Sequence, residues 1–165
     1  MATVTLSNPQ GSNKAPVQTS NLKTPYIIWK EVDFAAAATA KGSALAAADV
    51  IEALRIPKDH AIARAWVKKS TALTGTTADA AISLGVTGVA AAAYVSAWGL
   101  AAAAVGAYGT PTSPATHVIN GSASDTVDIL FTTLTGTLTG GKVIVYAEVV
   151  DLTVAGRGTI AQPKS

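Results

Sequence analysis

Between Asp79 and Asp125 the chain contains no Asp, Glu, Lys or Arg, and this charge-free run most constrains how it can fold. Charged residues make up only 13% of the whole chain, about half of the quarter that is usual in soluble domains. Because a surface with few charges is poorly hydrated, it is commonly covered by other protein. The sequence therefore predicts that part of residues 80–124 contacts a neighbouring subunit.

The chain has 165 residues, which suits a single domain with a hydrophobic core of its own. Residues 1–24 are polar and lack the apolar core of a secretory signal, so we expect an extended N-terminal arm. This arm is either disordered or ordered on a neighbour, and Ala2–Leu6 alternates and could add a strand to another sheet. Residues 25–152 are expected to form the domain, and residues 153–165 a short C-terminal tail.

Apolar and polar residues alternate through most of the domain, with the period of two that is typical of β-strands. The clearest examples are residues 26–34, 60–69, 80–86, 127–131 and 142–149. Residues 49–56 fit either a helix or a strand, and we favour a strand because Pro57 begins a turn. We expect about seven or eight short strands, which predicts an all-β fold, an antiparallel β-sandwich or jelly roll.

Small residues indicate three connections between these strands. Residues 35–42 are expected to be a linker. Residues 88–107 are expected to form a loop with short strand or helical pieces, because Gly99 and Gly106 disfavour a long helix. The Gly/Thr-rich turn at residues 135–141 is expected to join its two flanking strands into a hairpin.

Two pairs of acidic residues are candidate chemical sites. Glu31 and Asp33 fall on one face of a strand and could act together as the carboxylate pair of a glycosidase does. Asp125 and Asp128 flank the start of another strand and could help to hold Ca²⁺. Acids at strand edges more often keep a sheet soluble and prevent wrong pairing, and we favour that interpretation for both pairs.

The remaining chemistry-bearing residues give no further site. His60 and His117 lie on different expected strands without a nearby acid in sequence, so structural roles are favoured over metal binding or catalysis. The chain lacks Cys, which excludes disulfides and thiolate metal sites, and its net charge of +2 without a basic stripe argues against nucleic-acid binding. The apolar stretch Leu84–Val105 is rich in Ala and Gly and has no basic flanks, so a membrane span is rejected. We expect no enzyme activity, cofactor or metal.

Aromatic residues within the charge-free run have three possible roles. They could anchor a subunit interface, fill the core, or stack on sugars, and the first two uses are favoured over the third. The predicted interface residues are Val4 and Leu6 in the arm, and Tyr94, Trp98, Leu100 and Tyr108 in the run.

The order of the segments resembles a known family. A polar arm precedes the segments Val32-Asp33-Phe34, Ala48–Pro57, Trp66-Val67, Asp125–Ile129 and Gly141–Leu152, with a Thr/Gly/Ala-rich stretch in the middle. This layout resembles the small structural proteins of tailed bacteriophages that are described as head decoration or cement proteins.

The resemblance implies a jelly-roll-like domain, commonly trimeric, that sits on the exterior of the virion capsid. Such a protein is assembled in the host cytoplasm and clamps neighbouring subunits of the major capsid protein, with terminal arms reaching across the seams. The family offers no catalytic residues to carry over. A phage tail or fibre-knob subunit, or another carbohydrate-binding β-module, is the alternative.

Overall fold

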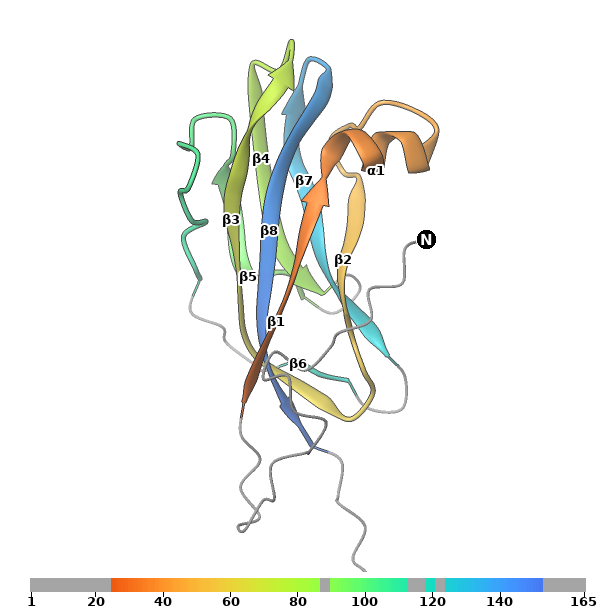
Figure 1. The fold of residues 1–165 in the computed structure, drawn as a ribbon, viewed down its shortest axis with the longest axis vertical. Coiled ribbons are helices and arrows are strands. Elements are labelled where there is room, and N and C mark those ends of the chain that lie inside the picture. The colour runs from red at the N-terminus through yellow and green to blue at the C-terminus, as the bar shows by residue number, and fades with distance from the viewer. Residues whose placement is uncertain (1–24, 87–89, 113–117, 121–123, 153–165) are drawn as a thin grey trace, which may run out of the picture.

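Two antiparallel sheets pack face to face in the computed structural model, which describes residues 25–86, 90–112, 118–120 and 124–152. The elements are β1 (Tyr26–Asp33), α1 (Phe34–Lys41), β2 (Val50–Ile56), β3 (His60–Gly75), β4 (Asp79–Val86), β5 (Ala90–Gly99), β6 (Val118–Asn120), β7 (Asp125–Thr135) and β8 (Leu138–Asp151). One sheet has the strand order β1-β8-β3-β6 and the other β2-β7-β4-β5 (Figure 1). The expected antiparallel β-sandwich is confirmed, and the jelly-roll description stays a prediction.

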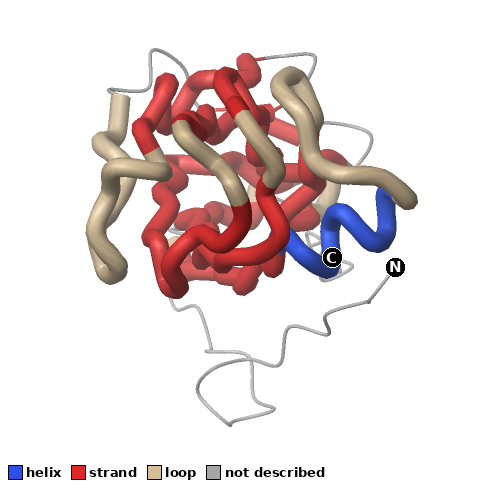
Figure 2. The backbone as a smooth tube through the Cα atoms, turned by 90° about the horizontal axis from the view of Figure 1, so that it is seen from above, coloured by secondary structure: helices blue, strands red, loops and turns tan. Residues whose placement is uncertain are grey.

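The core lies between the two sheets and is built by alternate residues of the strands. In β8, Val143, Val145 and Ala147 are buried, while the residues between them are only half-buried. Ile82 and Leu84 of β4, in the other sheet, belong to the same buried cluster. Seen from above, the strands form two layers, with α1 at one side and residues 100–112 at the other (Figure 2).

Residues Phe34–Lys41 form the helix α1, whereas the sequence predicts a linker here. The Asp33 side chain caps the helix by accepting hydrogen bonds from the backbone N–H groups of Ala35 (2.9 Å) and Ala36 (3.3 Å). Gly42 ends the helix in the left-handed conformation, with φ 78°. Alanine is the strongest helix former, so a run of alanines between these two caps is enough for two turns.

β7 and β8 lie in different sheets, so the expected hairpin between them is wrong. Two connections, β3 to β4 and β7 to β8, run side by side where the chain passes from one sheet to the other, and the backbone N–H of Thr76 donates to the carbonyl of Thr137 at 3.0 Å. Gly136 has φ 85°, and a Cβ there would lie 2.3 Å from the carbonyl oxygen of Thr76. The glycine therefore permits a close corner, and turn chemistry alone could not show that the chain changes sheet there.

Residues 90–99 form the strand β5, where the sequence predicts a loop with short regular pieces. Alanine-rich segments have low strand propensity, but β5 pairs with β4, and Val95 lies opposite Leu84 with both side chains fully buried. Residues 50–56 form β2, as the sequence favours over a helix. Tertiary packing thus decides the conformation of the alanine-rich strand.

Candidate interaction surface

Most of the large side chains that the structure describes in the charge-free run are packed inside the domain. Tyr94 is 1% exposed, and Val95 and Leu100 are fully buried. Tyr94 and Leu100, two of the predicted interface residues, are therefore unavailable for contact with another subunit in this fold. The run can lack charge because its strands β4 and β5 supply one wall of the core.

The other predicted interface residues lie in different places. Trp98 is half-buried and packs against the core, and Tyr108 is 55% exposed with the Lys68 Nζ atom 5.5 Å from its ring centroid. Val4 and Leu6 lie outside the described residues. Tyr108 is thus the one residue of this predicted set that the described part of the chain presents openly at the surface.

A buried lysine attaches residues 100–107 to β3. Lys69 is 4% exposed, and its ammonium group donates to the carbonyls of Leu100 (2.9 Å) and Ala103 (2.7 Å). Its own backbone exchanges hydrogen bonds with Ala107 and Gly106. Burial lowers the pKa of Lys69. The sequence shows Lys68-Lys69 only as a pair of basic residues, so this structural role has no signal in the sequence.

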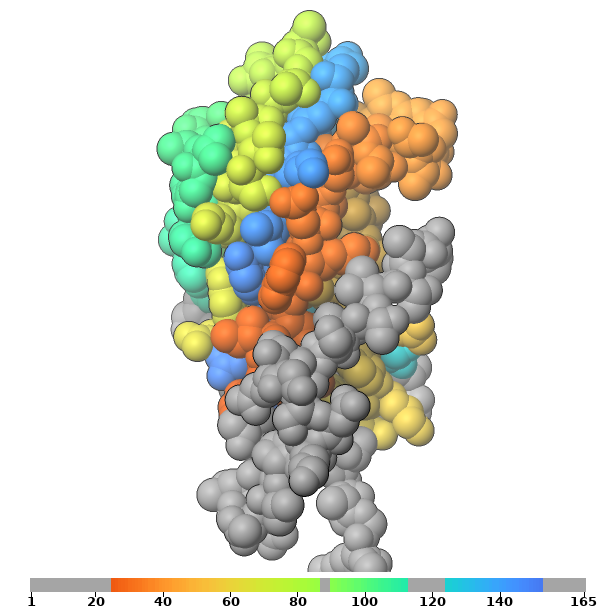
Figure 3. All heavy atoms as spheres, in the orientation of Figure 1, coloured from red at the N-terminus to blue at the C-terminus, as the bar shows by residue number. Residues whose placement is uncertain are grey.

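The outer face of the other sheet carries a row of aromatic residues that the sequence-based interface prediction missed. Trp29 on β1 lies opposite Tyr146 on β8, and Tyr146 lies opposite Trp66 on β3. With the neighbouring Ile27 and Ile144 these residues form what we call the aromatic face. Trp29 and Ile27 are 57% and 50% exposed, and the other three are half-buried. The strands that carry them lie side by side toward the viewer in Figure 3.

A β-bulge in β3 turns Ile62 into the core and leaves Arg64 and Trp66 on this outer face. Sequence alternation puts Ile62 and Arg64 on the same face as Trp66, but the register with β8 shifts between Ile62 and Arg64. Ile62 is consequently fully buried, whereas Arg64 and Trp66 lie on the outer side. The extra residue in β3 is Ala63, which lies between them.

The rings of the aromatic face are partly covered by one another. Trp66 and Tyr146 stack with centroids 5.4 Å apart and an interplanar angle of 8°. The Arg64 guanidinium lies 5.4 Å from the Trp66 ring centroid and also forms an ion pair with Glu148. Trp66 is therefore held between two neighbours, and Trp29 keeps the most open ring of the row.

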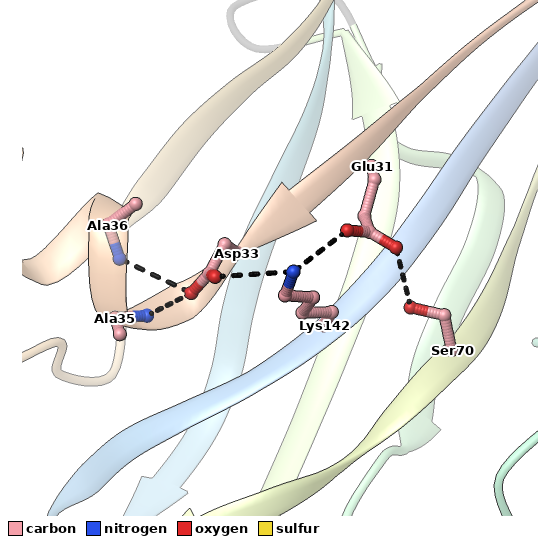
Figure 4. A network of polar contacts seen from close by, with 6 residues as sticks. All are labelled: Glu31, Asp33, Ala35, Ala36, Ser70 and Lys142. Atoms are coloured by element: carbon pink, nitrogen blue, oxygen red, sulfur yellow. Dashed lines mark hydrogen bonds and ion pairs between the residues drawn. The ribbon is translucent and has the colours of Figure 1, made fainter.

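Glu31 and Asp33, weighed above as a catalytic pair, hold strands together instead. The Lys142 ammonium on β8 lies 3.0 Å from the Glu31 carboxylate and 3.7 Å from that of Asp33 (Figure 4). Glu31 also accepts a hydrogen bond from Ser70 of β3 at 3.3 Å. The Glu31 hydrogen bond, followed by the charges of both acids, raises the pKa of Lys142. With Asp33 also capping α1, both carboxylates have structural partners.

The other candidate residues lie apart from one another wherever the structure describes them. No group of three or more His, Cys, Asp or Glu side chains that could hold a metal occurs among the described residues. Asp125 accepts from the backbone N–H of Thr126 at 2.8 Å, and Asp128 is buried in β7. His60 lies 2.7 Å from the Lys58 carbonyl and edge-on to Tyr26, whereas His117 lies outside the described residues.

Among the described residues, no helix has both the length and the apolar character needed to span a membrane. No protein-family model matches the sequence, and no curated protein matches it. The fold is similar to that of a chain in the cyanophage Pam1 capsid asymmetric unit, with a TM-score of 0.57 and 16% identity, over 87% of this chain and 96% of that chain. A chain in the capsid of Ralstonia phage GP4 gives a TM-score of 0.58 and 14% identity, over 88% and 95%. The likeness spans nearly all of both matched chains and shows a shared fold.

Proposed function

We propose that this chain is a non-enzymatic structural protein of a phage virion that binds the outer surface of the capsid and bridges subunits of the major capsid protein. One observation supports the proposal most strongly. The β-sandwich matches chains of two phage capsids over 95% or more of their length. The exposed aromatic face adds a surface suited to contact with another protein.

The physical benefit of such a protein is reinforcement of the shell. DNA packed into a phage head pushes outward, and a protein bound across the seam between two subunits raises the free energy needed to separate them. Individual contacts need not be strong, because many copies and several contacts per copy add through avidity. We propose a homotrimer, which triples the number of attachment points of each bridging unit.

The N-terminal arm is the second element of the proposal. An extended chain of 24 residues reaches roughly 80 Å, far enough to cross a seam between subunits. A polar segment that becomes ordered only on binding loses conformational entropy at that step, so the arm would bind weakly to isolated subunits and well to an assembled shell. Val4 and Leu6 are the arm residues proposed to contact the neighbour.

Co-sedimentation tests the function. Heads of the phage that encodes this chain, prepared from a mutant that lacks it, are mixed with the purified protein and pelleted. We expect the full-length protein to pellet with the heads and the variant lacking residues 1–23 to stay in the supernatant with its β-domain folded by circular dichroism. Full binding by the truncated variant would refute the role of the arm, and absence of binding by the full-length protein would refute the function.

Sugar binding by residues 94–108 is less well supported than shell binding. A pyranose ring stacks on an open aromatic face, and Tyr94 is buried while Trp98 is half-buried, which leaves Tyr108 as the open ring of that segment. A single ring without an aligned neighbour makes a poor platform for a glycan. Binding to a glycan array that is lost in Tyr108→Ala would restore the carbohydrate-binding alternative.

A further inference from the structure

The aromatic face presents one open tryptophan on a rigid support. Trp29 stands on β1 next to a stacked pair, Trp66 and Tyr146, whose rings hold each other in place. Because the rings are already ordered, covering them removes apolar surface from water with little further loss of side-chain entropy. An exposed tryptophan among pre-ordered neighbours has the character of a binding hot spot.

Most of the charges around the aromatic face are already paired within the chain, and the exception, Lys68 of β3, has a cation–π contact with Tyr108. Arg64 forms an ion pair with Glu148 on one side of the row, and Lys142 is paired with Glu31 and Asp33 on the other. A partner that covers these ion pairs needs no opposite charges for them, because the paired groups keep their own partners when water is removed. The face therefore suits a largely apolar protein surface rather than nucleic acid or an acidic glycan.

The size of the face argues against a dimer held by this contact alone. Strands ~4.8 Å apart with a rise of ~3.3 Å per residue give three strands, over the eight residues of β1, a surface of roughly 14 Å by 26 Å, about 400 Å². A stable interface of standard size buries about 800 Å² on each partner. The partner must then hold this chain at further points as well.

We propose that the aromatic face, anchored by Trp29, docks against a largely apolar patch on the shell built by the major capsid protein. The inference rests on the proposed function and names the surface that performs it. Residues 1–24 join the domain at Pro25, immediately before β1, so the arm starts from the strand that carries Trp29. Arm and face together supply the several contacts that the small face requires.

The test compares two alanine substitutions of exposed apolar residues in the full-length protein. Trp29→Ala removes the anchor, whereas Val50→Ala trims a 42% exposed residue on β2 in the other sheet. We expect Trp29→Ala to bind heads that lack this chain about tenfold or more weakly in co-sedimentation, and Val50→Ala to bind as the wild type does. Trp29→Phe, which keeps an aromatic ring, should recover part of the loss.

Three results would overturn the inference. Wild-type affinity in Trp29→Ala would mean that the face does not meet the shell, while the proposed function stands. Loss of the oligomer in Trp29→Ala, measured by light scattering after size exclusion, would assign the face to contact between copies of this chain. No binding by the wild type would remove the proposed function together with the inference. Thermal unfolding followed by circular dichroism verifies that each variant is folded.

Discussion

The charge-free run looks exposed from its sequence but is largely buried, whereas the strands of the aromatic face look well hydrated but expose large apolar side chains. Residues 80–112 look like a surface that needs covering, yet Tyr94, Val95 and Leu100 pack within the domain. The strands β1, β3 and β8 carry many charges and look well hydrated, yet they expose Trp29 beside Trp66 and Tyr146. The segment of low charge is therefore part of the core, while the aromatic face lies on strands that also carry charged residues.

The difference arises because the neighbours of a residue along its own strand differ from its neighbours on the adjacent strands. Along its own strand each aromatic residue has a charged side chain on at least one side of the same face, such as Glu31 beside Trp29 and Arg64 beside Trp66. Across the strands the three aromatics are direct neighbours in register. A patch built in this way is visible only once the strand order β1-β8-β3 is known.

The largest expected effect separates core from surface. Leu100→Ala, in the charge-free run, should lower the free energy of unfolding by about 2–5 kcal/mol, because it removes most of a fully buried side chain and leaves a cavity in its place. Trp29→Ala should lower it by about 1 kcal/mol or less, because more than half of that side chain is exposed. Urea denaturation measures both values. A smaller loss for Leu100→Ala than for Trp29→Ala would reverse our assignment of the two regions.

A second prediction compares two adjacent lysines of β3 that both contact the charge-free run, one buried and one at the surface. Lys69→Met should cost about 1–3 kcal/mol, because the carbonyls of Leu100 and Ala103 lose the buried donor that they share. Lys68→Met should cost about 1 kcal/mol or less, because it removes only a cation–π contact with the exposed Tyr108.

Hydrogen exchange distinguishes this loss from general destabilisation. The amide of Gly106 donates to the Lys69 carbonyl, so it should exchange faster in Lys69→Met even in buffer where the variant is fully folded. Unchanged exchange at Gly106, together with unchanged stability, would mean that residues 100–107 are held by other contacts.

Much of the fold could be predicted because strand alternation is a local property. The strands around Ile28, Val67, Leu84, Ile129 and Val145 alternate as predicted, and each of these residues is buried. The misses involve neighbours far apart in sequence or a single inserted residue. The corner at Gly136 sends β8 into the other sheet, and the β-bulge in β3 turns Ile62 from the charged face into the core. The two-turn helix α1 was missed because Asp33 reads as a strand residue until its capping role is seen.

The candidate site was harder to predict than the fold. Tyr94 and Leu100 were selected for the charge-free sequence around them, but burial depends on what the opposite sheet supplies, which no local pattern reports. Trp29 and Tyr146 each lie on the charged face of an alternating strand, and that signal was present in the sequence. Only the pairing of β1 and β3 with β8 joins these residues into one surface.

The prediction with the smallest effect on stability concerns the Arg64–Glu148 ion pair beside the aromatic face. Glu148→Gln should change the free energy of unfolding by about 1 kcal/mol or less, because its partner Arg64 is largely exposed. It should nevertheless weaken binding to phage heads, because Arg64 would then lose water without keeping a carboxylate partner. Exchanging both residues for Gln removes the unpaired charge, so binding should return toward the wild-type value.

The double variant makes this prediction specific to a covered surface. If the face stays in water in the bound state, Arg64 remains hydrated, so Glu148→Gln and the double variant bind as the wild type does and the coupling between the two positions is near zero. If the face is covered, the single variant binds more weakly than the double variant, and the two substitutions couple in binding but hardly in stability. That separation between the two measurements distinguishes a docking surface from an ordinary solvent-exposed ion pair.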